Sequence, residues 1–258
     1  MAIEKATGIV LYSRKQGETS KIITVYTCEF GKMSVMAKGS RGVRSKYTGA
    51  LETFNYIGMV LYTKENRSLN YLSDAHTIES FSRLHRNLGK MTLASIVCEI
   101  VEKSERENQS HPPLFQLLLD TLNTLDGNER GLRNVVRAFQ IQFVSIAGFE
   151  PSLDRCRQCG KETPDIQNLI SLEHGSYSCR ACTIPNQSDR ELSDKAILML
   201  RWLSNAPVSQ SVRAAIPARL GRELDILLME YMAYHMEELA GLKSVAYLQS
   251  LQTHLGTH

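Results

Sequence analysis

Residues 7–38 read TGIVLYSRKQGETSKIITVYTCEFGKMSVMAK, a stretch in which three runs of β-branched and aromatic residues alternate with turn-forming residues. These runs cover 7–13, 21–27 and 32–38, and FNYIGMVLYT at 54–63 and LNYLSDA at 69–75 continue the pattern. Runs of this kind between turns predict β-strands. Five short strands within about 75 residues suit a small barrel of the OB-fold type, which closes most of its sheet.

From about residue 78 onward, apolar residues recur at the three- and four-residue spacing of amphipathic helices. Prolines, glycines and capping residues predict where the helices begin and end. The predicted segments are 78–101, 112–127 opened by Pro112 and Pro113, 132–146 closed by Gly148, one capped by Ser193 or Asp194, and one from Pro217 to Leu239. Because 258 residues are long for one core, we expect an α+β protein with a barrel domain at 1–78 and an all-helical domain at 79–258.

The composition is that of an ordinary globular protein, with 43% hydrophobic and 22% charged residues. No apolar run approaches the length of a membrane helix, and Glu4 and Lys5 stand where a signal peptide would be apolar. We therefore expect a cytoplasmic protein without a membrane partner. The net charge is +3, and residues 1–80 hold 11 Lys and Arg against 7 Asp and Glu, so the basic charge belongs to the barrel.

Four of the six cysteines form two CxxC pairs, Cys156 with Cys159 and Cys179 with Cys182, separated by 19 residues. This spacing predicts two knuckles that share one tetrahedral Zn²⁺ ion, in a module at about 153–186 inserted among the helices. The stretches 163–172 and 174–178 predict a short hairpin that brings the knuckles together. Four thiolates leave no position for water or substrate, so we expect a structural ion that contributes folding energy.

Other interpretations of this region remain open. A pair of redox dithiols is disfavoured, because no βαβ pattern surrounds either CxxC. His174 lies five residues before Cys179, off the knuckle spacing, and is a poor candidate for a ligand. Four cations near the cysteines can contact phosphate or merely keep the module in solution, and composition does not separate the two: Arg155, Arg157, Lys161 and Arg180.

A glycine-rich loop in the barrel region is a second candidate site, since no acidic residue occurs between Phe30 and Leu51. Glycines let a backbone approach closely, cations neutralise phosphates, and Tyr47 offers a face on which an unpaired base can stack. An ordinary solvated loop would have the same composition, so that alternative stays open. The cations of the loop include Lys38, Arg41, Arg44 and Lys46, and the first hairpin adds Arg14, Lys15 and Lys21.

The stretch GIVLYSRKQGETSKIITVYTCEFGKMSVMAKGSRGVRSK at 8–46 resembles the opening of the RecO family, the bacterial recombination mediators of DNA repair. The particular points of resemblance are Gly-Glu-Thr at 17–19, the turn at 27–32, and Ala-Lys-Gly at 37–39 followed by basic residues. The length, GFEP at 148–151 leading into CRQCG at 156–160, and the later CxxC are also similar. The resemblance therefore covers nearly the whole chain.

The resemblance implies an N-terminal OB-fold barrel, a helical C-terminal domain and a zinc module inserted in it. It implies DNA contact by the basic barrel loop, which carries over to Lys38, Arg41, Arg44 and Lys46, and less directly to Arg14, Lys15 and Lys21. Some relatives lack the zinc cysteines, so zinc would support the fold rather than the shared activity.

The activities implied are binding of single- and double-stranded DNA and annealing of complementary strands, without covalent catalysis. The partners implied are RecR, the C-terminal tail of single-stranded DNA-binding protein and, indirectly, RecA, at the nucleoid of a bacterial cytoplasm. A different hypothesis makes the chain a protein-interaction scaffold with incidental DNA contact. A metalloenzyme or an ATPase is disfavoured, because the chain has neither an HExxH nor a GxxxxGK[ST] motif.

Overall fold

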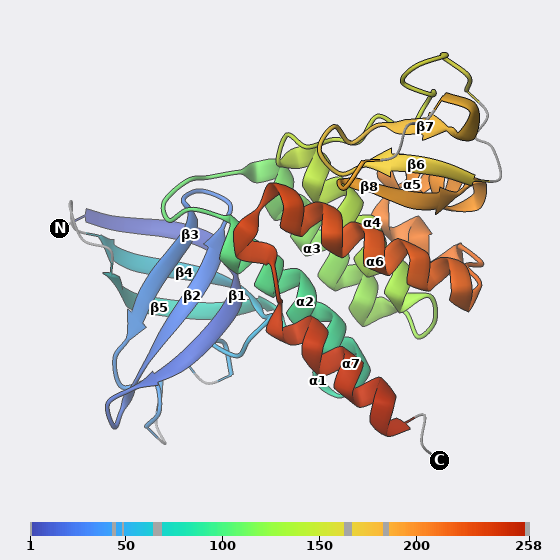
Figure 1. Ribbon diagram of the computed structural model, residues 1–258. Coiled ribbons are helices and arrows are strands. Elements are labelled where there is room, and N and C mark those ends of the chain that lie inside the picture. Colours follow the sequence, from blue (N-terminus) through green and yellow to red (C-terminus); the bar gives the residue numbers. More distant parts are fainter. Residues whose placement is uncertain are drawn as a thin grey trace. The chain divides into compact units, whose positions relative to one another are not determined.

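Two compact units make up the protein in a computed structural model, which describes residues 2–42, 45–47, 49–63, 69–162, 167–182 and 186–255. One unit consists of Met1–Gly127 together with Leu242–His258, and the other of Asn128–Gly241. We call them the barrel unit and the helical unit, and Figure 1 shows the elements of both. The boundaries between the compact units follow Gly127 and Gly241 rather than residue 78, because several helices belong to the same unit as the strands.

The strands of the barrel unit form a closed barrel in the order β1-β2-β3-β5-β4, and β4 pairs with β1 to complete it. Strands β3 and β5 run parallel, whereas the other neighbours are antiparallel, which is the arrangement of an OB-fold. Residues such as Val10, Ile23, Val35 and Leu61 fill its core. The strands are β1 (Ala2–Gln16), β2 (Ser20–Thr27), β3 (Gly31–Ala37), β4 (Tyr56–Thr63) and β5 (Leu69–Glu79). The predicted barrel is confirmed.

Strand β5 is longer than the sequence pattern predicts, since Ile78 was expected to begin the helical region. Residues near the end of β5 pair with the start of β4, as in the pairs Thr77 with Ile57 and Glu79 with Tyr56. Pairing therefore keeps this segment extended, and Ile78 lies 46% exposed on the strand.

Among the described residues, four helices accompany the barrel: α1 (Ser82–His85), α2 (Leu88–Ser104), α3 (Pro112–Gly127) and α7 (Lys243–Leu255). Phe115 of α3 packs against two barrel residues, with ring centroids 6.3 Å from Tyr26 and 6.0 Å from Tyr56. Helix α7, which the sequence pattern did not predict, packs with α2. The carboxylate of Glu99 on α2 accepts the backbone N–H groups of Lys243 and Ser244, and so caps α7.

The helical unit consists of helices and a small sheet of three strands in the order β7-β6-β8. Ser193 caps α5 as predicted, because its side chain accepts the backbone N–H of Ala196. The last long helix ends at His235, before Leu239, and a 3₁₀ turn follows it. The elements are α4 (Leu132–Ile146), β6 (Gln167–Ser171), β7 (Tyr177–Cys179), η1 (Arg180–Cys182), β8 (Asp189–Ser193), α5 (Asp194–Asn205), η2 (Val208–Arg213), α6 (Ala218–His235) and η3 (Glu237–Leu239).

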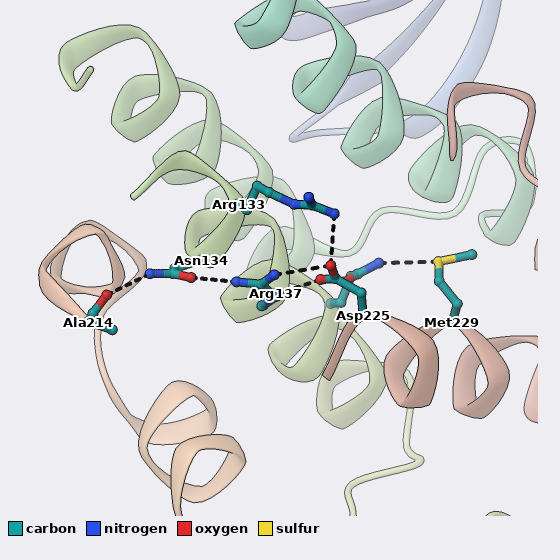
Figure 2. A network of polar contacts seen from close by, with 7 residues as sticks. Arg133, Asn134, Arg137, Ala214, Asp225 and Met229 are labelled. Atoms are coloured by element: carbon teal, nitrogen blue, oxygen red, sulfur yellow. Dashed lines mark hydrogen bonds and ion pairs between the residues drawn. The ribbon is translucent and has the colours of Figure 1, made fainter. Parts of the chain in front are cut away.

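A polar network around Arg137 joins α4 to α6 (Figure 2). The Arg137 side chain is only 7% exposed, and its Nε and Nη2 donate to the two carboxylate oxygens of Asp225 at 2.7 and 3.0 Å. Its Nη1 donates to Asn134 Oδ1 at 2.6 Å, and Asn134 Nδ2 donates to the carbonyl oxygen of Ala214. Arg133, closer to solvent, donates to Asp225 at 2.8 Å. Each buried polar group is thereby paired, which is the condition for keeping such groups inside a protein.

The helices in the described parts of the chain include none that is both long and apolar enough to cross a membrane.

Candidate functional site

Four cysteine sulfurs gather in the helical unit at the two knuckles. The Sγ atoms of Cys156, Cys159, Cys179 and Cys182 all lie within 4.8 Å of one another, and the pair Cys159 and Cys179 is separated by 3.7 Å. Sulfurs at the corners of a tetrahedron about 2.3 Å from a zinc ion would lie about 3.8 Å apart. The four thiols that the spacing paired are therefore brought together, and they can hold a metal ion.

The backbone around the first knuckle favours negative charge on the sulfur of Cys156. The N–H of Cys179 donates to Cys156 Sγ at 3.4 Å, and Gly160 takes the positive φ of 74° that closes the first knuckle. Burial acts to raise the pKa of Cys156, but backbone N–H donors from Cys159, Cys179 and Gln158 outweigh it and lower the pKa to about 6. Hydrogen bonding to Cys179 and Cys159 raises the pKa of Cys182 to about 12. Several thiolates this close need a cation between them, so the donor set fits a thiophilic divalent ion.

Strand pairing and one arginine hold the knuckles in place. The predicted hairpin is present as β6 and β7, in which Asn168 lies opposite Cys179, and β8 adds a third strand that was not predicted. From α5, Arg201 Nη2 donates to the carbonyl oxygens of Asp154 at 2.6 Å and Glu162 at 3.0 Å. The Arg201 guanidinium also lies 5.7 Å from the ring centroid of Tyr177. Arg201 is thus a supporting residue of the site that sequence reasoning missed.

The buried ring of Tyr177 completes this support. Its hydroxyl donates to the carbonyl oxygen of Lys161 at 2.8 Å, and the Lys161 carbonyl also accepts the N–H of Cys156 at 2.8 Å. Burial raises the pKa of Tyr177, although the charge of Arg201 opposes the rise, so the hydroxyl stays a donor. The Tyr177 hydroxyl and the Lys161 carbonyl therefore hold in place the chain segment that carries Cys156.

The other polar residues of the module lie outside the sulfur cluster. His174 is 45% exposed and faces Glu173, with Nε2 and Oε2 4.0 Å apart, and among the described residues the cluster holds only the four cysteines. The four cations that the sequence left open are all exposed: Arg155, Arg157, Lys161 and Arg180. Their exposure suits either of the two roles considered.

The cations of the first barrel hairpin divide between two faces of the sheet. Lys15 lies opposite Lys21 in the register of β1 and β2, whereas Arg14 lies opposite Ile22. Neighbouring residues of a strand point to opposite faces, so Arg14 lies on one face and the two lysines on the other. Lys21 forms an ion pair with Glu52 at 3.3 Å. The structure thus separates these three residues, which sequence reasoning had grouped.

The described cations of the basic loop each contact a residue at or near an end of β1 or β5. Arg41 Nη1 donates to the carbonyl oxygen of Gly17 at 2.9 Å, which ties the loop to the turn of the first hairpin. Lys38 Nζ lies 4.8 Å from the ring centroid of Tyr71, and Lys46 Nζ donates to the carbonyl oxygen of Ser73. All three cations are exposed. Arg44, the fourth predicted contact, lies outside the described residues.

Tyr47 does not offer the stacking face that the loop composition suggested. Its side chain is 5% exposed and belongs to the barrel core, and its hydroxyl donates to the carbonyl oxygen of Leu72 at 2.9 Å. The expectation was wrong because this tyrosine packs into the barrel core, where its ring removes apolar surface from water.

Comparison with known proteins gives matches along nearly the whole chain. The family model "Recombination protein O N terminal" matches residues 1–81, and "Recombination protein O C terminal" matches residues 85–245. The "DNA repair protein RecO" of Symbiobacterium thermophilum is 29% identical, over 98% of this chain and 99% of its own length. Proteins of the same name from Prosthecochloris aestuarii and Salinibacter ruber are each 30% identical, over 90% and 92% of this chain and 92% and 90% of their own lengths.

Proposed function

This chain belongs to the RecO family of DNA repair proteins, and from this premise we propose that it is a recombination mediator whose barrel unit binds DNA. The observation that supports the proposal most directly is that Lys38, Arg41 and Lys46 of one loop are exposed and each contacts a residue of a closed OB-fold barrel. Barrels of this kind are common platforms for single strands, and exposed cations bind phosphates whatever the base sequence.

The activity that this surface supports is the annealing of complementary strands. Two strands repel each other through their phosphates, and cations that neutralise phosphates lower this repulsion while they release counterions. The same cations bind single- and double-stranded DNA, because both present a phosphate backbone. Such a reaction makes and breaks only non-covalent contacts, so we propose that the protein is not an enzyme.

The metal that the four cysteines would hold is, in this proposal, Zn²⁺, which prefers four thiolates in a tetrahedral arrangement. Its contribution would be folding energy for the module. Arg201 and Tyr177 hold the chain segments that carry the first knuckle, so the site and its support act as one unit.

The partners in this proposal follow from the family. Together with RecR, the protein would help to load RecA onto strands covered by single-stranded DNA-binding protein, and the C-terminal tail of that protein would contact it. This work would take place at the nucleoid, in the bacterial cytoplasm.

The test is an annealing assay with fluorescent complementary oligonucleotides, combined with anisotropy binding over a series of salt concentrations. The variant changes Lys38, Arg41 and Lys46 to Glu. The logarithm of the binding constant falls linearly with the logarithm of the salt concentration, and each lost phosphate contact should reduce the magnitude of this slope by about 0.7 for a single strand. Three lost contacts should therefore reduce it by about 2. We expect slower annealing and this smaller slope.

The matched control makes the same change of net charge elsewhere in the barrel unit, at the exposed residues Arg83, Arg86 and Arg106. It should anneal close to the wild-type rate. If the loop variant keeps both the annealing rate and the salt slope, or if the control loses as much as the loop variant, the loop is not the DNA site.

A second candidate function, a protein-interaction scaffold, is favoured by the surface of the helical unit. An open cavity of about 1190 Å³ is lined by residues of β8, α5 and α6, including Lys195, Leu198 and Arg219. On α5, Leu198 is 50% exposed and Trp202 is 39% exposed. The lining also holds the carboxylates Glu191, Asp194 and Glu223, so its apolar side chains, rather than a net positive charge, would receive a protein segment.

The two functions are separated by a Leu198→Ser variant tested in a repair assay beside the basic-loop variant. If repair survives loss of the basic loop and is abolished when Leu198→Ser loses its protein partner, the scaffold is the main role. The opposite pattern supports the DNA mediator.

A further inference from the structure

Four outward-facing residues lie in one line across the barrel. Ile3 of β1 is opposite Tyr62 of β4, Tyr62 is opposite Tyr71 of β5, and Tyr71 is opposite Met36 of β3. Directly opposed residues of neighbouring strands have side chains in contact distance on the same face. We call these four residues the tyrosine row.

The row lies on the outer surface of the barrel, because neighbours of its members along β3, β4 and β5 fill the core. Leu61, Leu72 and Val35, each adjacent in sequence to a member of the row, belong to the buried cluster. Within the row, Ile3 is 65% exposed and Tyr62 is 39% exposed, while Tyr71 and Met36 are half-buried. The sequence pattern gave no reason to single out these tyrosines, because strand alternation also occurs on an ordinary solvated face.

Cations border the tyrosine row. The Lys38 ammonium lies 4.8 Å from the ring centroid of Tyr71, and Lys46 donates to the carbonyl oxygen of Ser73, two residues further along β5. Beyond Met36 the line of opposed residues continues across β2 to β1: Met36 lies opposite Ile22, and Ile22 lies opposite Arg14. An aromatic and apolar surface is therefore flanked at both of these places by exposed positive charge.

We infer that the tyrosine row is a stacking platform for the bases of an unpaired DNA strand. This rests on the proposed function and deepens it by assigning the surface that distinguishes single strands from duplex. Bases of a duplex are stacked on one another and paired, so only an unpaired strand can lay its bases on Tyr62 and Tyr71. Lys38, Lys46 and Arg14 then lie where the phosphates of such a strand need counter-charges.

The chemistry of the row favours this occupant over a protein segment. A ring with a lysine ammonium beside it suits a base whose phosphate the lysine can bind at the same time. A hydrophobic peptide would bury the lysine and gain nothing from its charge. Base stacking is also indifferent to sequence, as annealing of arbitrary complements requires.

The test measures binding of the full-length protein to oligothymidine and to a blunt duplex by fluorescence anisotropy. The variants are Tyr62→Ala with Tyr71→Ala, and Tyr71→Phe, which keeps the ring. The matched control is Tyr12→Ala, because Tyr12 is 56% exposed on β1 but pairs with Thr24, outside the row. Loss of one base–aromatic stack corresponds to roughly fivefold or more in affinity.

We expect the double variant to bind oligothymidine at least about fivefold more weakly, with duplex affinity and salt slope unchanged. Tyr71→Phe and Tyr12→Ala should bind like the wild type. Unchanged oligothymidine binding by the double variant, or an equal loss for duplex, overturns the inference.

A second measurement does not depend on the stability of the variants. A single strand that contains 2-aminopurine should change its fluorescence intensity on binding to the wild-type protein. The fluorescence of this base depends on its stacking, so it changes when the base leaves its neighbours and stacks on a tyrosine ring. Binding without any such change overturns the stacking role, and the proposed DNA function stands. A wild-type protein that binds neither DNA form refutes both.

Discussion

Replacing Arg137 with Ala should destabilise the helical unit strongly. The side chain is 7% exposed, and its loss removes both hydrogen bonds to Asp225 and the one to Asn134. Breaking a buried ion pair costs about 3–5 kcal/mol, because the remaining charge stays desolvated. Asp225 is 29% exposed and keeps Arg133, so the lower end of this range, about 3 kcal/mol, is expected here.

The control is Arg133→Ala. This side chain binds the same carboxylate but is 44% exposed, and an exposed pair contributes about 0–1 kcal/mol. The two variants thus remove the same kind of ion pair with Asp225 at different depths. Gly221 provides a second check, because a Cβ there would lie 2.7 Å from Arg137 Nη2. Gly221→Ala should therefore destabilise the wild-type protein more than it destabilises the Arg137→Ala variant.

Urea unfolding followed by tryptophan fluorescence is the assay. The chain has one tryptophan, Trp202, and it lies on α5 in the helical unit, so the signal reports this unit. The midpoint should fall far more for Arg137→Ala than for Arg133→Ala, with the slope m unchanged. Equal shifts for the two variants would show that burial of the guanidinium does not govern the energy, and would refute the reasoning.

Three further predictions concern the metal, pH and backbone. Cys179→Ser should lose the bound metal and lower the melting temperature of the helical unit while annealing persists; metal analysis and thermal melts check this. Burial acts to raise the pKa of Glu99, but the Ser244 hydroxyl and the N–H groups of Ser244 and Lys243 outweigh it and lower the pKa. The capping contribution of Glu99 is therefore present above the ordinary carboxyl pKa and is lost as pH falls through the lowered pKa. The protection factors of the α7 amides, corrected for the intrinsic pH dependence of exchange, should therefore fall on acidification in the wild type, and Glu99→Gln should abolish this fall. Gly31→Ala should cost roughly 1–3 kcal/mol or more, because φ is 70° and a Cβ would lie 1.8 Å from Gln109 O; Gly17→Ala, with φ of 59° and open space, should cost less in the same melts.

The barrel could be predicted because each of its strands has a recognisable pattern within its own residues. In residues 7–38 the β-branched runs and the turn formers are neighbours in sequence, so short windows suffice. Strand β8, with the sequence DRELS, has no such run, and it is extended because it pairs with β6. Helix α7 was missed for a similar reason, since its cap, Glu99, lies 144 residues before Lys243. Elements that depend on a distant partner leave little trace in their own residues.

The candidate sites show the same division. The cysteine cluster could be predicted because the spacing within each CxxC is local, and the structure gathers all four sulfurs. Arg201 could not, because the carbonyl groups that it binds lie about forty residues earlier, at Asp154 and Glu162. Tyr47 was misjudged because a glycine-rich loop does not show which of its side chains turns into the core.

The return of α7 to the barrel unit makes residues 128–241 an insertion between two parts of one compact unit. During synthesis the barrel strands leave the ribosome before the helical unit, whereas α7, which packs with α2, leaves after it. The helical unit can therefore complete its fold while the barrel unit still lacks its closing helix. Until Lys243 emerges, the carboxylate of Glu99 has no helix terminus to cap, so the nascent barrel unit is completed only by residues that are made after the helical unit.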